Sequence, residues 1–136
     1  MNHILLVEDD PNDVFLMQRA MSKAKLSLPM HVAINGQEAI DYLSGEGKYG
    51  DRNIYPIPNH LFLDLKMPLV NGFEVLEWLR DQSSLGNIDV FVLSSSPEER
   101  DRDRSQKLGA KAYLVKPPTP EMLLEVLRPS ESKFDS

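Results

Sequence analysis

Short apolar runs alternate along this chain with stretches whose apolar residues recur at helical spacing. Five runs are continuous enough to predict strands buried on both faces, as in a parallel sheet. They are His3–Val7, Met30–Ala33, His60–Leu63, Val90–Leu93 and Ala112–Val115. A helical segment follows each run. This alternation predicts an α/β domain, a doubly wound five-stranded parallel sheet with five helices and right-handed crossovers.

The starts of several helices are marked by a capping residue followed by proline or by an acid. Asp10-Pro11 and Thr119-Pro120 each place proline at a first helical position. Asn35 is followed three residues later by an acid, which indicates a second capped start. Ser96–Glu99 carries cap, proline and glutamate in order and predicts that the fourth helix begins there.

Two segments depart from the regular pattern. Ser44–Asn59 is a long loop rich in Gly, Pro and Tyr, and loops of that length are usually functional or mobile. Glu98–Lys107 has the position of a helix but is almost entirely polar, so we expect it to be locally less stable. Two interpretations of it stay open: a solvated face, or a segment that reorders when the protein changes state.

Composition narrows the classes of partner and compartment. A chain of 136 residues suits one domain, and its net charge of −6 argues against direct binding of nucleic acid. There are no cysteines, which excludes disulfides and thiolate metal sites. No apolar run is long enough for membrane insertion, and no signal-peptide core precedes the first strand. We therefore expect a cytoplasmic protein.

Polar residues follow four of the five predicted strands. Glu8 and Asp9 come after the first, Asp64 after the third, Ser94 after the fourth and Lys116 after the fifth. Ligands of open α/β sheets bind beyond the carboxyl ends of the strands, so these side chains should meet there. Three crowded carboxylates raise one another's pKa unless a cation intervenes, and hard oxygen ligands favour Mg²⁺.

Acids, a metal and a lysine are what phosphoryl chemistry requires. Asp64 can act as a nucleophile and form an acyl phosphate, while Lys116 neutralises charge on the transferred group. Ser94 would offer its hydroxyl to the new phosphoryl oxygen, a contact that exists only in the modified state. The plainer alternatives are a strand-end acid at Asp64 and a surface lysine at Lys116. Asp10, by contrast, is better explained as a helix cap than as a metal ligand.

The motifs VEDDP, LFLDLKMPLVNG, VLSSS and AYLVKPP together resemble the receiver domain of two-component response regulators. The resemblance runs from His3 to about Arg128 and implies the flavodoxin-like strand order 2-1-3-4-5 of the chemotaxis receiver. It implies a receiver domain over residues 1–128 and a short polar tail over 129–136, with no output domain. The long loop is similar to that of single-domain receivers paired with phytochrome-type or hybrid histidine kinases.

The resemblance also implies roles for the residues around the expected metal. Asp64 takes the position of the phosphoacceptor, and Asp9 that of the direct Mg²⁺ ligand. Glu8 is expected to act on the metal through water, and the backbone carbonyl of Lys66 is the remaining protein ligand.

A second group of implied roles concerns the switch. Ser94 takes the place of the switch serine or threonine, and Lys116 that of the lysine before a cis proline. Tyr113 falls where an aromatic ring turns inward or outward with phosphorylation state. The implied partners are a histidine kinase or histidine phosphotransfer protein and a downstream protein of unknown identity, and homodimerisation stays open. The protein would catalyse only its own phosphorylation and dephosphorylation and is not otherwise an enzyme.

Three other functions compete with this interpretation of the sequence. A flavodoxin-like FMN carrier would need a Ser/Thr/Gly-rich phosphate loop where this chain has Glu8–Asp10. A Mg²⁺-dependent phosphatase with an aspartyl nucleophile generally needs a second acid at the position of Lys66. An adaptor that never takes phosphate, a pseudo-receiver, is the serious rival. Pseudo-receivers usually lack an acid or the lysine, and here all are present.

Overall fold

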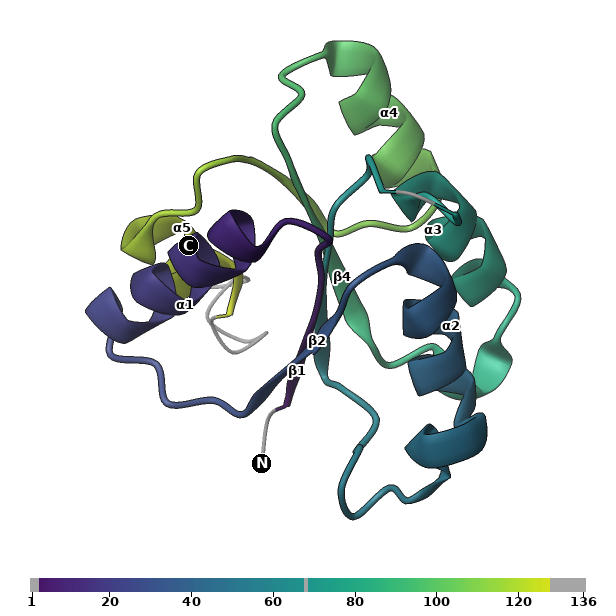
Figure 1. Cartoon of the computed structure of the whole chain (residues 1–136). Helices are drawn as coiled ribbons and strands as arrows, with labels where there is room; N and C mark the ends of the chain where they lie inside the picture. The colour runs from purple at the N-terminus through teal and green to yellow at the C-terminus, as the bar shows by residue number, and fades with distance from the viewer. Residues whose placement is uncertain (1–2, 68, 128–136) are drawn as a thin grey trace.

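Parallel strands form the central layer of the molecule, and helices cover both faces of the sheet (Figure 1). The computed structural model describes residues 3–67 and 69–127. The strands are β1 (Ile4–Val7), β2 (Met30–Ala33), β3 (His60–Leu63), β4 (Asp89–Ser94) and β5 (Ala112–Val115). Their order is β2-β1-β3-β4-β5, which confirms the order implied by the resemblance.

The helices fall into two groups, one on each face of the sheet. The α-helices are α1 (Pro11–Lys23), α2 (Gly36–Ser44), α3 (Gly72–Arg80), α4 (Glu99–Lys107) and α5 (Pro120–Val126), and the short 3₁₀ helices are η1 (Gly47–Gly50) and η2 (Ser83–Leu85). Residues of α1 and α5 share one apolar core with the sheet, and residues of α2 and α3 share the other. The predicted tail over 129–136 lies outside the described residues.

The first strand shows why a continuous apolar run was the right signal. Leu5 and Val7 point into the core beneath α2 and α3, whereas Ile4 and Leu6 point into the core beneath α1 and α5. All four side chains are buried. A strand that has helices on both sides needs apolar residues at successive positions, because successive side chains face opposite layers.

Three of the predicted helix starts are confirmed by their hydrogen bonds. The side chain of Asp10 accepts from the backbone N–H of Asn12, and that of Asn35 accepts from Glu38 at 2.7 Å. The hydroxyl of Thr119 accepts from the backbone N–H of Met122 at 3.1 Å. These bonds satisfy backbone donors that the first turn of a helix leaves unpaired.

The predicted start of the fourth helix was wrong. Helix α4 begins at Glu99, with Glu98 in the cap position and no side-chain cap bond there. Ser96 is buried instead, and its hydroxyl donates to the carboxylate of Asp101 at 2.7 Å. It also accepts from the backbone N–H of Glu98 at 3.3 Å, so it organises the turn that precedes the helix.

Polar side chains dominate α4 as expected. Within the helix only Ser105 is buried, and its hydroxyl donates to the carbonyl of Asp101. Leu108, which follows the last turn, packs against the core beneath α2 and α3. The guanidinium of Arg104 lies 4.1 Å from the ring centre of Phe73 on α3. Helix α4 is therefore held by few buried groups and presents a largely solvated face.

The long loop between α2 and β3 is packed around aromatic rings and one arginine. The guanidinium of Arg52 donates to the carbonyls of Tyr42 and Leu43 at 2.8 Å and to that of Tyr55 at 3.2 Å. The ring of Tyr49 lies within 5.1 Å of those of Tyr42 and Tyr55, measured between centres. Arg52 thus supplies donors to carbonyls of the last turn of α2, of which that of Tyr42 also accepts from the backbone N–H of Gly45.

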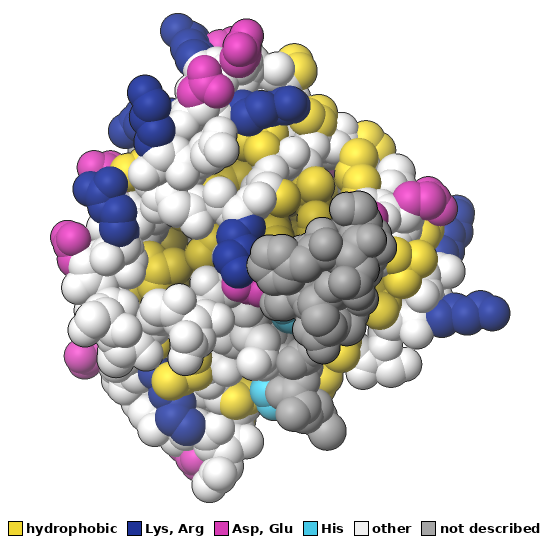
Figure 2. Space-filling model, turned by 180° about the vertical axis from the view of Figure 1, so that it is seen from behind, with side chains coloured by type: hydrophobic (Ala, Val, Ile, Leu, Met, Phe, Trp, Pro, Cys, Tyr) yellow, Lys and Arg dark blue, Asp and Glu magenta, His cyan; other side chains and the backbone are white. Residues whose placement is uncertain are grey.

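The surface mixes charges of both signs. On the face seen in Figure 2, basic and acidic side chains are interspersed around the margin, with apolar side chains between them. Among the described residues, no helix has the length and apolar character needed to cross a bilayer.

Candidate functional site

The three acids predicted to meet at one edge of the sheet do so. Glu8 and Asp64 continue directly from β1 and β3, which lie side by side in parallel. The backbone N–H of Asp64 donates to the carbonyl of Val7 at 3.1 Å, which fixes the two strand ends together. Carboxylate oxygens of Glu8, Asp9 and Asp64 all lie within 4.8 Å of one another. This spacing suits oxygen coordination of one divalent cation.

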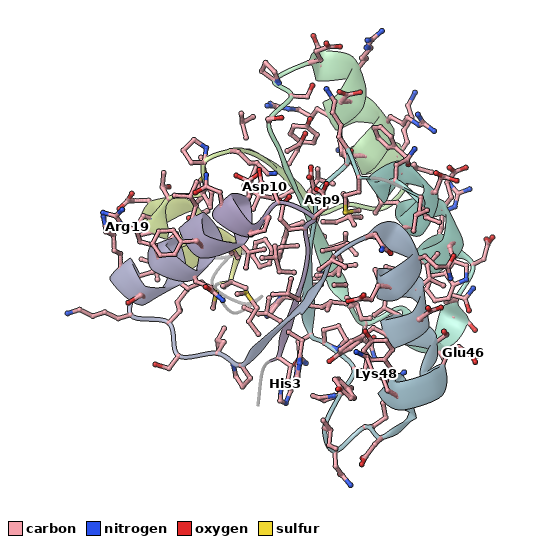
Figure 3. All side chains as sticks on the ribbon, viewed as in Figure 1. His3, Asp9, Asp10, Arg19, Glu46 and Lys48 are labelled. Carbon is pink, nitrogen blue, oxygen red and sulfur yellow. The ribbon has the colours of Figure 1, made fainter. Side chains whose placement is uncertain are left out.

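The acids differ in exposure. Glu8 and Asp64 are 2% and 6% exposed, whereas Asp9 faces solvent just before α1 (Figure 3). Burial raises the pKa of Glu8, with a further upward contribution from Asp64, while the ammonium of Lys116 and the backbone N–H of Asp10 oppose the rise. The crevice therefore holds more negative charge than its protein partners neutralise, and a cation would relieve it.

Lys116 is the cationic centre of the site. It follows β5, and its backbone N–H donates to the carbonyl of Ser94 at 2.8 Å, so the end of β4 positions it. Its Nζ lies 2.7 Å from Oε1 of Glu8, 2.8 Å from Oδ2 of Asp13 and 3.4 Å from Oδ2 of Asp64. The following bond to Pro117 is cis, as the resemblance implied.

Electrostatics keep this lysine charged. Burial alone would lower the pKa of the Lys116 ammonium, but the hydrogen bonds that it donates to Asp13 and Glu8 and the nearby charge of Asp64 outweigh burial and raise the pKa. The ammonium is thus available as a permanent positive charge beside Asp64.

Asp13 is the residue of this site that sequence reasoning missed. It lies in the first turn of α1, not after a strand, so the rule of strand carboxyl ends does not find it. The signal in the sequence was an acid in the first turn of the helix that follows Glu8 and Asp9, close to the carboxyl end of the first strand. An acid in a first helical turn is common for reasons of the helix dipole alone.

Ser94, Ser96 and Tyr113 form a hydrogen-bonded chain beside the acids. Ser94 is fully buried at the end of β4, and its Oγ accepts from the backbone N–H of Ser96 at 3.1 Å. The hydroxyl of Tyr113 donates to the carbonyl of Ser96 at 2.7 Å. The two residues predicted to act as a switch are therefore linked through Ser96, whose role sequence reasoning had placed in helix capping.

The loop after Asp64 is held close to α3. The backbone N–H of Lys66 lies 3.4 Å from Oδ1 of Asp64, and its side chain is exposed. The backbone N–H of Gly72, the first residue of α3, donates to the carbonyl of Leu65 at 3.0 Å. A Cβ on Gly72 would lie 2.3 Å from the carbonyl oxygen of Asp64, so this approach requires glycine. The role of the Lys66 carbonyl as a metal ligand stays a prediction.

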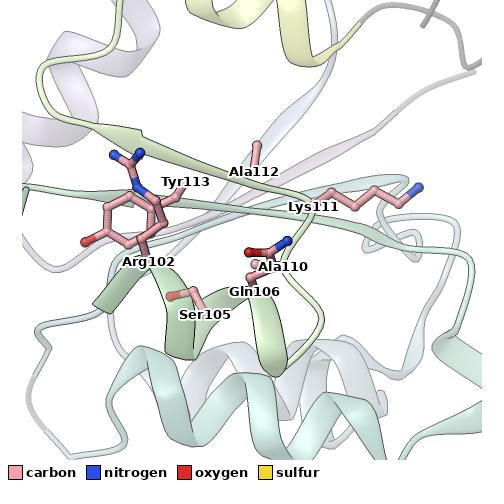
Figure 4. A pocket seen from close by; sticks show the side chains of 7 residues that line it. All are labelled: Arg102, Ser105, Gln106, Ala110, Lys111, Ala112 and Tyr113. Carbon is pink, nitrogen blue, oxygen red and sulfur yellow. The ribbon is translucent and has the colours of Figure 1, made fainter. Parts of the chain in front are cut away.

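A separate pocket of about 240 Å³ lies between α4 and β5 (Figure 4). Its lining residues are Arg102, Ser105, Gln106, Ala110, Lys111, Ala112 and Tyr113. The guanidinium of Arg102 lies 5.5 Å from the ring centre of Tyr113. The ring of Tyr113 therefore forms part of this pocket, while its hydroxyl reaches toward the loop after β4.

Residues 4–128 match the family model of the response regulator receiver domain. The chain belongs to this family. Response regulator Rcp1 of Synechocystis sp. is 32% identical over 129 residues, which are 95% of this chain and 86% of Rcp1. The Mn²⁺-bound form of Rcp1 superposes with a TM-score of 0.77 at 30% identity, over 98% of this chain and 94% of that chain.

Two other solved receivers are similar over most of their length. The bacteriophytochrome response regulator AtBRR has a TM-score of 0.82 at 40% identity, covering 93% of this chain and 90% of that chain. The phosphorylated cyanobacterial phytochrome response regulator RcpA has a TM-score of 0.78 at 32% identity, covering 92% and 87%. The receiver fold predicted from the motifs is thereby confirmed, and the acid cluster lies where strands β1 and β3 end.

Proposed function

We propose that this receiver domain accepts a phosphoryl group on Asp64 in a Mg²⁺-dependent reaction, from a histidine kinase or a histidine phosphotransfer protein. The convergence of Glu8, Asp9 and Asp64 beside the ammonium of Lys116 is the observation that carries this proposal. Family membership supports it, as does the phosphorylated state in which the similar RcpA was solved.

The donor set fits a hard divalent cation. Asp9 and Asp64 would bind Mg²⁺ directly, Glu8 would act through water, and the carbonyl of Lys66 would complete the protein ligands. All are oxygen donors, which Mg²⁺ prefers, and the exposure of Asp9 leaves a path from solvent. When bound, the metal would neutralise charge on the phosphoryl oxygens.

The chemistry of the chain's own residues is a displacement at phosphorus. A carboxylate oxygen of Asp64 forms the new P–O bond as the P–N bond of the donor phosphohistidine breaks, and the imidazole leaves with that electron pair and takes up a proton. Lys116 balances charge on the transferred group, because its ammonium lies beside Asp64. Ser94 then donates its hydroxyl to a phosphoryl oxygen.

The proposed readout is a change in the Ser94–Ser96–Tyr113 chain. A phosphoryl oxygen that recruits Ser94 would alter the turn before α4, because Ser94 and Ser96 share a hydrogen bond. The hydroxyl of Tyr113 is tied to the same turn. We propose that this change alters a surface read by a downstream protein, with no direct role for nucleic acid.

The names of similar proteins suggest the class of upstream partner. AtBRR and RcpA are described as phytochrome response regulators, and we propose that a kinase of the phytochrome or hybrid type serves this receiver in the cytoplasm. Residues 1–128 would act as the receiver, with phosphorylation and dephosphorylation of Asp64 as its only catalysed reactions.

The test is the intact mass after incubation with acetyl phosphate and Mg²⁺, beside an Asp64→Asn variant. One added phosphoryl group is expected in the unmodified chain, and none in the variant or without Mg²⁺. If no adduct forms, beryllium fluoride binding separates rapid hydrolysis from an inert site. If neither an adduct nor beryllium fluoride binding is found, the proposal is refuted and the adaptor function is favoured.

A further inference from the structure

The ammonium of Lys116 contacts three carboxylates at unequal distances. Those to Glu8 and Asp13, 2.7 and 2.8 Å, are in the range of strong charge-assisted hydrogen bonds. The distance to Asp64, 3.4 Å, is at the upper limit for any hydrogen bond. The ammonium is thus held toward the side of α1 rather than against the proposed phosphoacceptor.

Asp13 brings a second structural element into this contact. It lies on the first turn of α1, whereas Lys116 lies between β5 and α5, and α1 and α5 pack together on one face of the sheet (Figure 1). The side chain of Asp13 is 26% exposed and that of Lys116 is 12% exposed, so water screens the pair only partly. The helix dipole explains an acid at this position, but it does not explain the contact with Lys116.

We propose that Asp13 is a positioning residue that restrains Lys116 in the unphosphorylated protein and releases it when Asp64 carries a phosphoryl group. The inference rests on the proposed function. An acyl phosphate adds negative charge at Asp64, which draws the ammonium away from Asp13. No bond is made or broken at Asp13; its carboxylate only exchanges an ammonium partner for water.

The restraint predicts a direction of effect. An interaction made only in the unphosphorylated state opposes the modified state, so weakening it should favour the phosphorylated form and its mimic. Asp13→Asn keeps the shape of the side chain and removes its charge. We expect its affinity for beryllium fluoride, at saturating Mg²⁺, to rise about threefold to tenfold.

The matched control is Asp10→Asn. Asp10 loses the same charge three residues away, its bond to the N–H of Asn12 is one that asparagine makes equally well, and its side chain is exposed. Any gain in anion affinity from net charge alone will therefore appear in both variants. Asp13→Glu restores the charge and should return the affinity toward that of the unmodified chain. Urea unfolding checks that the variants remain folded.

Two measurements test whether Asp13 restrains Lys116. Titration calorimetry measures beryllium fluoride affinity, and the ¹⁵Nζ signal of Lys116 reports the contact in the resting protein. A larger affinity gain in Asp13→Asn than in Asp10→Asn, with a shifted Lys116 signal, is expected. Equal gains, or a loss of affinity in Asp13→Asn, would overturn the restraint. If the unmodified chain binds no beryllium fluoride, the proposed function itself fails, a result distinct from equal gains in a chain that binds it.

Discussion

The close approach of Gly72 to the segment that carries Asp64 can be tested by adding one methyl group. A Cβ at this position would lie 2.3 Å from the carbonyl oxygen of Asp64 and 2.7 Å from Cα of Leu65. Both are backbone atoms, so no side chain can rotate to make room. Gly72→Ala must therefore displace either the start of α3 or the segment that carries Asp64.

Two effects of opposite sign determine how much Gly72→Ala changes the free energy of unfolding. Overpacking costs about 1–3 kcal/mol and rises when backbone has to move. Alanine at Gly72 also restricts the unfolded chain and favours helix, which returns about 0.4–1 kcal/mol. The steric effect should prevail, because the contact lies about 1 Å inside ordinary van der Waals separation. We expect a net loss of about 1–2 kcal/mol in the free energy of unfolding and, on the proposed function, slower phosphorylation of Asp64.

Gly86→Ala is the matched control, and urea unfolding followed by circular dichroism is the assay. Gly86 has φ of −68°, and an added Cβ would lie 3.4 Å from the carbonyl oxygen of Ser83, which is ordinary contact. This variant should be unchanged or slightly more stable. Equal stability of Gly72→Ala and Gly86→Ala would refute the steric reasoning.

Three further predictions concern a loop, a pH dependence and a turn. The lysine of Arg52→Lys cannot reach three carbonyls at once. We therefore expect faster amide exchange across residues 45–59 and a loss of about 1–2 kcal/mol in the free energy of unfolding. Burial raises the pKa of Glu8 from 4.5 to about 7, so the folded protein keeps a proton there that the unfolded chain has lost. Stability without metal should fall as pH rises between these values, and Glu8→Gln should lack this contribution. Ser96→Ala removes the partner of Asp101, and amide exchange in α4 should become faster.

Each of these three predictions has a control and an outcome that would contradict it. Exchange near Asp64 should not change in Arg52→Lys, and uniform acceleration throughout the chain would contradict a local anchor. For Glu8 the measurement is the difference in unfolding free energy between the two proteins, and a difference that is constant from pH 4.5 to 7 would contradict the raised pKa. In Ser96→Ala, unchanged exchange in α4 would show that its bond to Asp101 does not hold the helix.

The strands and most helix starts followed from local signals. The inner strands β1, β3 and β4 are buried on both faces, so their apolar runs need no knowledge of their neighbours. The edge strands β2 and β5 are only partly buried, so for them the prediction of full burial was wrong. The cap at Asp10 is equally local, because donor and acceptor lie two residues apart. The prediction of where α4 begins was wrong for the opposite reason. Burial of Ser96 directs its hydroxyl to Asp101, and that burial depends on β4 and β5, which the local sequence does not reveal.

The residues of the site also divide into those that the sequence pattern predicts and those that depend on tertiary packing. Parallel strands bring their carboxyl ends together, so residues after strands, such as Asp64 and Lys116, could be grouped before any coordinates. Asp13 could not, because its contact with Lys116 spans 103 positions and depends on how α1 is rotated against the loop before α5. Helical periodicity alone gives the face of a residue, but not the element that the face meets.

The long loop illustrates how separation in space constrains function. Its 3₁₀ helix and Arg52 anchor lie at the end of the sheet where β3 begins, whereas Asp9 lies at the end where β1 finishes (Figure 3). Labelled Glu46 and Lys48 accordingly appear far from Asp9 in that view. Recognition of this loop and access to Asp64 therefore involve opposite ends of the sheet. Changes confined to the loop should alter recognition while leaving the chemistry of the acids unchanged.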